Sequence, residues 1–267
     1  MKTPPVISAL CVVLSCHASA QVPATETFEY PVDSPMRAAD GGTGWSTPWM
    51  GDLELNTELP EDLLVTADSL DSPAFRSRGL EPTGNRFQVP DSNVGARLFR
   101  GLENKITWGQ NGTHYISFLV LWSGSHSTAS SRIQLALGEQ GSGDVFSGAT
   151  FVGLHSAEND DAMRLVVRNQ GETSYGTQSL PAGRVYFVVA RLTTAPGDLP
   201  DEVSALVYGP EDEVPVQEPG EWMATAVKAR TGLTVLVDLG LYVYKGNREV
   251  SFDELRMGNT WESVTAR

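Results

Sequence analysis

The feature that most restricts the fold of this chain is a series of short apolar runs with no helical period among them. Apolar residues never recur over a sustained stretch at the i, i+3, i+4, i+7 spacing of an amphipathic helix. Instead, runs rich in Val, Leu, Phe and Tyr are separated by Gly, Pro, Asp and Asn. This pattern predicts an all-β chain, a two-sheet antiparallel β-sandwich or jelly roll with little helix. The expected strands are residues 27–32, 85–89, 96–101, 115–122, 132–137, 150–155, 163–168, 184–192, 203–208, 233–237, 241–244 and 249–257.

Alternation within these runs predicts which faces are buried. In RLVVRN the leucine and the second valine point to one face, and Arg164 and Arg168 point to the other. The run HYISFLVLW (114–122) is apolar on both faces, which predicts a central strand. In VSFDELRM the apolar residues slip in phase by one, so we expect a bulge or kink near Glu254.

The first twenty residues have the pattern of a signal peptide. Lys2 precedes a mostly apolar run of residues 6–15, which is too short to span a bilayer, and Ala18-Ser19-Ala20 is a small-x-small cleavage signal. Val13-Leu14-Ser15-Cys16 loosely resembles a bacterial lipobox, so a lipid anchor on Cys16 is the alternative. We therefore expect an exported protein (periplasmic, cell-surface or secreted) whose residues 21–267 form one domain.

Cysteine content and net charge further limit how the chain can be stabilised and which partners it can bind. Both cysteines, Cys11 and Cys16, fall in the expected signal peptide, so the mature chain must fold on its core without a disulfide. The net charge of −14 argues against a nucleic-acid partner, because such a surface repels phosphate. No second apolar run is long enough to predict a transmembrane segment.

Two segments resemble a known group of domains. FEYPVDSPMRAADGGTGWSTPW (28–49) and VSFDELRMGNTWESV (250–264) are similar to the opening and closing strands of concanavalin A-like (LamG-like) jelly rolls of exported bacterial proteins, which are largely uncharacterised. The resemblance implies about 12–14 strands, with the first and last side by side and Trp261 capping the core. The fold hosts lectins, adhesion modules and glycan-cleaving enzymes, and it does not select among them.

Motifs for catalysis are missing from the sequence. The Glu-x-Asp-x-x-Glu pattern of laminarinase-type enzymes, which sets acids on one strand face, does not occur, and neither does a Gly-x-Ser-x-Gly elbow. Asp253 and Glu254 are adjacent and should point to opposite faces. A hydrolase or lyase on this fold would need two convergent acids, or a His-Tyr or Arg group, in a cleft.

A structural Ca²⁺ is one hypothesis for the acidic residues. If the terminal strands pair, Glu29 and Asp253 could approach one another and bind the ion. The alternative is that Asp253 accepts backbone N–H bonds from a neighbouring turn. Removal of Ca²⁺ with EDTA should lower the melting temperature only if the first hypothesis holds.

Carbohydrate binding would need exposed aromatic rings beside polar groups. Trp108, in KITWGQNG, and Trp122, before a Ser-rich loop, are the candidates, whereas Trp45 and Trp261 are expected to pack in the core or in turns. The sequence therefore predicts a non-catalytic module that binds a polysaccharide or another extracellular surface component. The alternatives are a structural or adhesive module without a sugar site, and a glycan hydrolase or lyase.

Overall fold

The structure is a computed structural model that describes residues 24–51, 63–76, 79–90, 96–123, 131–139, 150–156, 162–229, 234–244 and 249–266. The expected signal peptide, with Cys16, lies outside the described residues. Within them the chain forms two short helices, α1 (Pro73–Arg76) and α2 (Trp261–Thr265), and otherwise strands. None of the described helices is long and apolar enough to cross a membrane.

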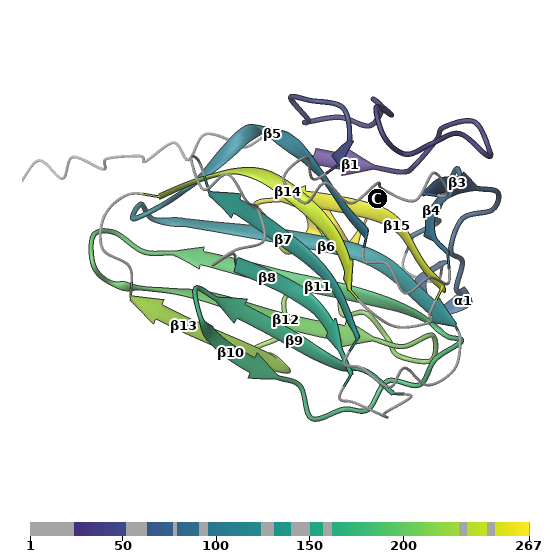
Figure 1. Cartoon of the computed structure of the whole chain (residues 1–267). Coiled ribbons are helices and arrows are strands. Elements are labelled where there is room, and N and C mark those ends of the chain that lie inside the picture. Colours follow the sequence, from purple (N-terminus) through teal and green to yellow (C-terminus); the bar gives the residue numbers. More distant parts are fainter. Residues whose placement is uncertain are drawn as a thin grey trace, which may run out of the picture.

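The strands form two antiparallel sheets that pack face to face (Figure 1). The first sheet has the order β13-β12-β11-β6-β15-β4-β3, with β1 also paired to β15. Its strands are β1 (Ala24–Glu26), β3 (Leu64–Thr66), β4 (Arg86–Val89), β6 (Gly112–Ser123), β11 (Val185–Thr194), β12 (Pro200–Tyr208), β13 (Ala224–Ala229) and β15 (Glu249–Gly258).

The second sheet has the order β10-β9-β8-β7-β14-β5-β2. Its strands are β2 (Met50–Gly51), β5 (Ala96–Trp108), β7 (Arg132–Glu139), β8 (Thr150–His155), β9 (Arg164–Asn169), β10 (Glu172–Tyr175) and β14 (Thr234–Tyr244). The predicted two-sheet antiparallel sandwich is thereby confirmed.

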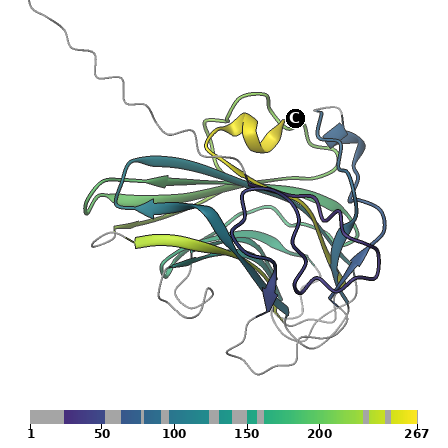
Figure 2. The same ribbon diagram turned by 90° about the horizontal axis from the view of Figure 1, so that it is seen from above.

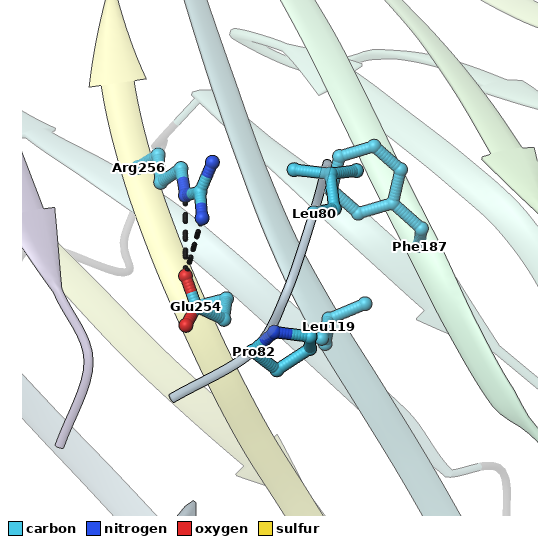
Figure 3. A pocket seen from close by; sticks show the side chains of 6 residues that line it. All are labelled: Leu80, Pro82, Leu119, Phe187, Glu254 and Arg256. Carbon is cyan, nitrogen blue, oxygen red and sulfur yellow. Dashed lines mark hydrogen bonds and ion pairs between the residues drawn. The ribbon is translucent and has the colours of Figure 1, made fainter. Parts of the chain in front are cut away.

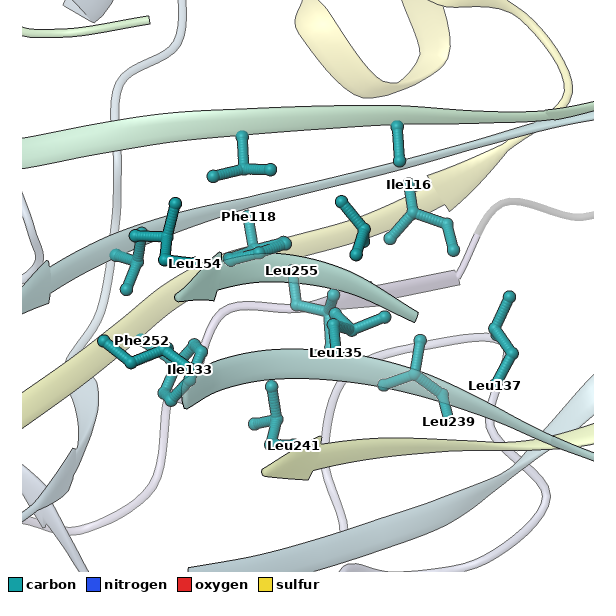
Figure 4. Packing of buried hydrophobic residues seen from close by; sticks show 14 of the residues in the cluster. Ile116, Phe118, Ile133, Leu135, Leu137, Leu154, Leu239, Leu241, Phe252 and Leu255 are labelled. Carbon is teal, nitrogen blue, oxygen red and sulfur yellow. The ribbon is translucent and has the colours of Figure 1, made fainter. Parts of the chain in front are cut away.

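One continuous apolar core fills the space between the sheets. Figure 4 shows Ile116, Phe118 and Phe252 of the first sheet meeting Leu135 and Leu154 of the second. These side chains alternate with outward-pointing neighbours, as the period of two in the sequence requires. Burial of such large apolar side chains supplies the stability that the chain, with no cysteine after Cys16, cannot take from disulfides.

The outer face of the first sheet is covered by a second apolar layer. Helix α2 packs Trp261 and Val264 onto Tyr115 and Leu119 of β6, and it lies on the side of the sheet away from the core (Figure 2). Thr260 caps this helix by accepting a hydrogen bond from the backbone N–H of Ser263. Trp261 is therefore buried, but it covers the outside of the sheet rather than the inter-sheet core.

The closing strand lies beside the opening strand, as the resemblance implied. Thr25 of β1 pairs with Arg256 of β15. The expected bulge is present, because the register of β15 with β6 shifts between Asp253 and Arg256, and Glu254 has a φ of +49°. The expected central position of β6, between β11 and β15, is also confirmed.

Several strand predictions need correction. Residues 27–32 are not a strand, because Phe28 has a φ of +52° and the opening strand ends at Glu26. The separate runs 233–237 and 241–244 belong to one strand, β14, which continues through a register shift at Leu236. Strands β10 and β13 were not predicted, because their sequences, ETSY and ATAVKA, are mostly polar or small.

The opening segment is held by a buried ion pair. Arg100 and Glu26 are 2.6 Å apart at Nη1 and Oε2, and both side chains are excluded from solvent. Trp49 Nε1 and the Tyr30 hydroxyl also donate to Glu26 Oε2, at 3.0 and 2.8 Å. Burial and the Glu26 charge raise the pKa of Tyr30. This network fixes residues 24–49 onto β5.

Candidate functional site

The outer face of the second sheet presents the best candidate site. Figure 1 looks onto this face, with β7, β8, β9, β10 and β14 in front. Ile133, Leu135, Val152, Leu154 and their counterparts on the neighbouring strands point into the core, so the residues between them point outward. We call the outward set the arginine face; it comprises Arg97, Phe99, Arg132, Gln134, Phe151, His155, Arg164, Arg168, Tyr175, Tyr242 and Tyr244.

Strand register places four polar residues of this face in one row. Tyr244 of β14 is paired with Arg132 of β7, Arg132 is paired with His155 of β8, and His155 is paired with Arg164 of β9. Neighbouring strands are about 4.8 Å apart, so the row of phenol, guanidinium, imidazole and guanidinium spans about 14 Å. A single extended ligand can contact all four side chains.

A fifth side chain reaches the row from the sheet edge. β9 and β10 are joined by the two-residue turn Gln170-Gly171, in which both residues have positive φ, as a tight hairpin requires. The turn places Tyr175 of β10 opposite Val166 of β9. The Tyr175 ring lies 5.7 Å from the His155 ring, between centroids, and is 52% exposed. Tyr175 and His155 therefore lean toward each other across β9.

Guanidinium groups lie against aromatic rings along the face. Arg97 Cζ is 4.7 Å from the centre of the Tyr242 ring, and Arg132 Cζ is 5.9 Å from the centre of the Tyr244 ring. The two tyrosine rings are themselves 5.7 Å apart. Arg168 Cζ is 5.8 Å from the Phe151 ring. Such cation–π contacts hold the charged heads in place against the rings.

Two rows further along the face, past the row of Tyr242 and Gln134, small residues lie between two aromatic rings. Phe99 of β5 is paired with Gly240, Gly240 with Ala136, and Ala136 with Phe151. The two phenylalanines are three strands apart, about 14 Å, and only a hydrogen and a methyl group separate them. Apolar C–H faces of a sugar stack on rings of this kind. Gly240 and Ala136 are buried, so a ligand would reach the half-buried rings of Phe99 and Phe151 rather than the residues between them.

The charges of the face differ from those of the rest of the molecule. Arg132, Arg164 and Arg168 have no carboxylate within ion-pair distance among the described residues. The ion pairs between described residues involve cations outside the arginine face: Arg76, Arg100, Arg184, Arg191, Lys228 and Arg256. In a chain of net charge −14, a group of arginines without carboxylate partners is a candidate anion site.

Burial and neighbouring charge shift the pKa values of two groups on the face, His155 and Tyr242. Partial burial lowers the pKa of His155, and the positive charge of Arg132 lowers it further. The His155 imidazole is thus neutral at pH 7. Burial raises the pKa of Tyr242, against the opposing effect of its contact with Arg97. The same face thus holds fixed positive charge, a neutral imidazole and the un-ionised phenol of Tyr242.

The structure corrects the two predicted ligand-binding tryptophans. Trp108 and Trp122 are both fully buried in the core, and Trp122 stacks on Tyr186 with ring centres 4.9 Å apart. Neither ring offers a face to a ligand. The reason is strand phase, because each Trp lies at an inward position near the end of a long strand.

The two residues predicted to bind a metal are not brought together as a site. Glu29 is exposed, whereas Asp253 is fully buried. Asp253 Oδ2 accepts from Leu70 N at 2.7 Å and from the Ser69 hydroxyl, and Oδ1 accepts from Glu254 N at 2.8 Å. Asp253 thus accepts backbone N–H bonds from neighbouring residues, which was the alternative to Ca²⁺ binding for this side chain. No cluster of three or more metal-ligating side chains occurs within the ranges that the structure describes.

A small pocket on the first sheet is a weaker candidate (Figure 3). Leu80, Leu119 and Phe187 face the ion pair of Glu254 Oε2 and Arg256 Nη2, which is 2.6 Å long. Glu254 Oε1 already accepts from Thr83 N at 2.9 Å. The cavity volume of about 10 Å³ is close to the space that one water molecule needs. It is too small for a sugar chain.

The arginine face was missed because its residues come from six separate strands. One signal was available: apart from the inward Arg100, the arginines and aromatics of ARLFRG, RIQLAL, TFVGLH, RLVVRN and LYVY occupy the outward phase of alternating strands. Arg164 and Arg168 were correctly placed opposite Leu165 and Val167. Which outward residues become neighbours depends on strand order and register, and these were not available from the pattern.

No protein-family model and no curated protein matches this chain. Among solved structures it is similar to the endo-β-1,4-glucuronan lyase from the fungus Trichoderma reesei, with 13% identity, a TM-score of 0.48, and coverage of 92% of this chain and 98% of that one. It is also similar to the exoplasmic/lumenal domain of VIP36 in its Ca²⁺- and Man2-bound form, with 10% identity, a TM-score of 0.45, and coverage of 89% and 90%. The legume lectin-like domain from Entamoeba histolytica has 12% identity, a TM-score of 0.40, and coverage of 67% and 85%. These likenesses concern the fold and do not bear on the ligand.

Proposed function

We propose that the protein binds an anionic polysaccharide, with carboxylate groups on its sugar units, along the arginine face. The observation that carries this proposal is the set of Arg132, Arg164 and Arg168, which lack carboxylate partners among the described residues. Arg132 and Arg168 also lie against aromatic rings. A guanidinium binds a carboxylate through two parallel hydrogen bonds. An anionic glycan therefore supplies the charges that these arginines lack.

Electrostatics favour an anionic over a neutral glycan. A net charge of −14 repels polyanions in general, so an anionic ligand needs a local positive region to bind at all. The residues that make up the arginine face include no carboxylate, and Asp238, on the same side of β14, lies four residues before Tyr242. The row from Tyr244 to Arg164 thus keeps its positive character.

The aromatic residues favour a sugar over another anion. Phe99, Phe151 and Tyr244 are half-buried and offer rings for C–H stacking. A peptide or phosphate ligand would use the arginines but would not need these rings. Together, the row of charges and the rings match a linear chain of uronate units.

The test is a binding titration of the full protein with oligomers of 1,4-linked galacturonate, glucuronate and mannuronate. The same oligomers with methyl-esterified carboxylates serve as neutral controls of equal shape, and sulfated oligosaccharides show whether sulfate can replace carboxylate. We expect saturable binding to at least one uronate and loss of binding on esterification. Equal affinity for the esterified and the charged oligomers would overturn the proposal, and so would binding restricted to the sulfated chains.

Matched substitutions locate the site. Arg164→Gln removes a charge from the face, and Arg184→Gln removes one that pairs with Glu211 outside the face. The first should weaken uronate binding and the second should not. Export to the cell surface or beyond, inferred from residues 1–20, would place the protein where such polysaccharides occur, and we include it in the proposal.

A further inference from the structure

The geometry points to a second activity at the same face: cleavage of a 1,4-linked uronate chain by β-elimination, with His155 as base and Tyr175 as acid. This inference rests on the binding function proposed above. It gives a role to the neutral imidazole of His155 and to the exposed phenol of Tyr175, whose ring lies against that imidazole. A hydrolytic reading would need two convergent carboxylates, and the face presents none among the described residues near His155.

The first step of the argument is the place of the substrate carboxylate. Arg132 and Arg164 are the residues directly opposite His155 on its two neighbouring strands. Directly opposed side chains have Cβ atoms about 4.5–5.5 Å apart. A uronate carboxylate bound by either guanidinium therefore brings the carbon that bears it, C5, next to the imidazole. Charge neutralisation by the guanidinium also makes the C5 hydrogen more acidic.

The second step is the protonation state of the base. The groups that face His155 are Arg132 from β7, Arg164 from β9 and Tyr175 from β10. Two of these are cations, so the surroundings of His155 disfavour the imidazolium form. Burial acts in the same direction and lowers the pKa of His155. A neutral imidazole beside a bound carboxylate is a competent general base.

The reaction balances without any further reactant. The His155 imidazole takes the proton from C5, and the electrons of the C5–H bond form a double bond between C4 and C5. The bond between C4 and the bridging oxygen O4 breaks, and O4 takes a proton from the Tyr175 hydroxyl. Proton transfer from the His155 imidazolium to the Tyr175 oxygen then restores both groups. The products are a new chain end at O4 and an unsaturated uronate.

The experiment is incubation of the full protein with the three oligouronates, followed through the ultraviolet absorbance of the conjugated double bond and by mass spectrometry. We expect products that sum to the mass of the substrate with no added water. His155→Gln should lower the rate about 100-fold or more, as expected for loss of a general base, while oligouronate affinity is retained. Tyr175→Phe should lower the rate in the same way.

His114→Gln is the matched control. His114 is also partly buried with a lowered pKa, but it lies on β6 of the other sheet, and its replacement should leave the rate unchanged. Binding of an oligouronate without any unsaturated product would overturn the elimination while leaving the binding function intact. Products that have gained water, or full activity in His155→Gln, would also overturn it. Absence of binding would overturn the proposed function itself.

Discussion

Arg132 on β7 and His155 on β8 lie directly opposite each other on the outer face of the second sheet. The pairing combines a permanent positive charge with an imidazole whose pKa is lowered by burial and, further, by this charge. It is also the point where the row from Tyr244 to Arg164 crosses the middle of the sheet. The pairing therefore places a group proposed to bind a uronate carboxylate beside the group proposed to remove a proton from the same sugar unit.

Removal of single arginines should weaken binding by a predictable amount. Arg132→Gln or Arg164→Gln deletes one charge-assisted hydrogen-bond partner, which contributes about 1.5 kcal/mol or more, so affinity for an oligouronate should fall about tenfold. Isothermal titration calorimetry measures the change.

Affinity of the unaltered protein should also fall as salt rises, because exposed charges are screened. Affinity that is independent of salt would contradict a charge-based site.

Binding and turnover should respond to pH in opposite directions. As pH falls through the pKa of His155, which lies below the ordinary value of 6.5, the imidazole gains a proton. The added positive charge should strengthen uronate binding, whereas loss of the neutral base should reduce the elimination rate. Titrations and rate measurements at a series of pH values check this. In His155→Gln the pH dependence of binding in this range should disappear.

Gly153 should not tolerate a side chain. A Cβ at this position would lie 2.0 Å from Ile133 O and 2.7 Å from Gln134 Cα on β7. Gly153→Ala should therefore force β7 and β8 apart, lower the free energy of unfolding by about 1–3 kcal/mol, and weaken ligand binding. Chemical denaturation measures the first effect. Gly220→Ala is the control, because a Cβ at Gly220 meets nothing within 4 Å.

The buried pair of Arg100 and Glu26 should be more costly to break than to remove. Arg100→Met leaves the Glu26 carboxylate buried without its charge partner, so we expect a loss of about 3–5 kcal/mol in the free energy of unfolding. Glu26→Gln combined with Arg100→Met should be less destabilising than the sum of the two single changes. A strictly additive double variant would show that the two groups do not act together.

Asp253 should make stability depend on pH. Burial raises its pKa to about 8, against the opposing hydrogen bonds from Ser69 and Leu70. The folded state then holds the proton more tightly than the unfolded state. The stabilisation from this group is fully present below the unfolded pKa and is lost as pH rises toward 8. The unfolding free energy of the natural protein relative to Asp253→Asn should fall across that range and level off above it. A flat difference would contradict the buried, protonated carboxyl.

The fold could be predicted from sequence because its signals are local. The alternation of Leu165 and Val167 with arginines marks a half-buried strand, and the phase slip around Glu254 marks a bulge, without reference to any other strand. Phe28 shows the limit of such reasoning. Its sequence neighbours alternate like a strand, but the buried carboxylate of Glu26 accepts its N–H at 2.9 Å and holds a conformation with positive φ.

The site could not be predicted in the same way, because it exists only after strands are paired. Tyr244, Arg132, His155 and Arg164 span more than a hundred positions of sequence, and only the order β14-β7-β8-β9 makes them a row. Trp108 was mistaken for a ligand residue for a related reason. A tryptophan before a Gly-rich turn resembles a loop residue until the inward phase of β5 is known.

The most direct test of the central claim is the affinity of the full protein for one oligouronate and for its methyl-esterified form, measured side by side for the natural chain and for Arg132→Gln. We predict binding of the charged oligomer by the natural chain, about tenfold weaker binding by the variant, and little binding of the ester by either. Equal binding of both oligomers, or an affinity that Arg132→Gln leaves unchanged, would contradict the assignment of the arginine face as an anionic glycan site.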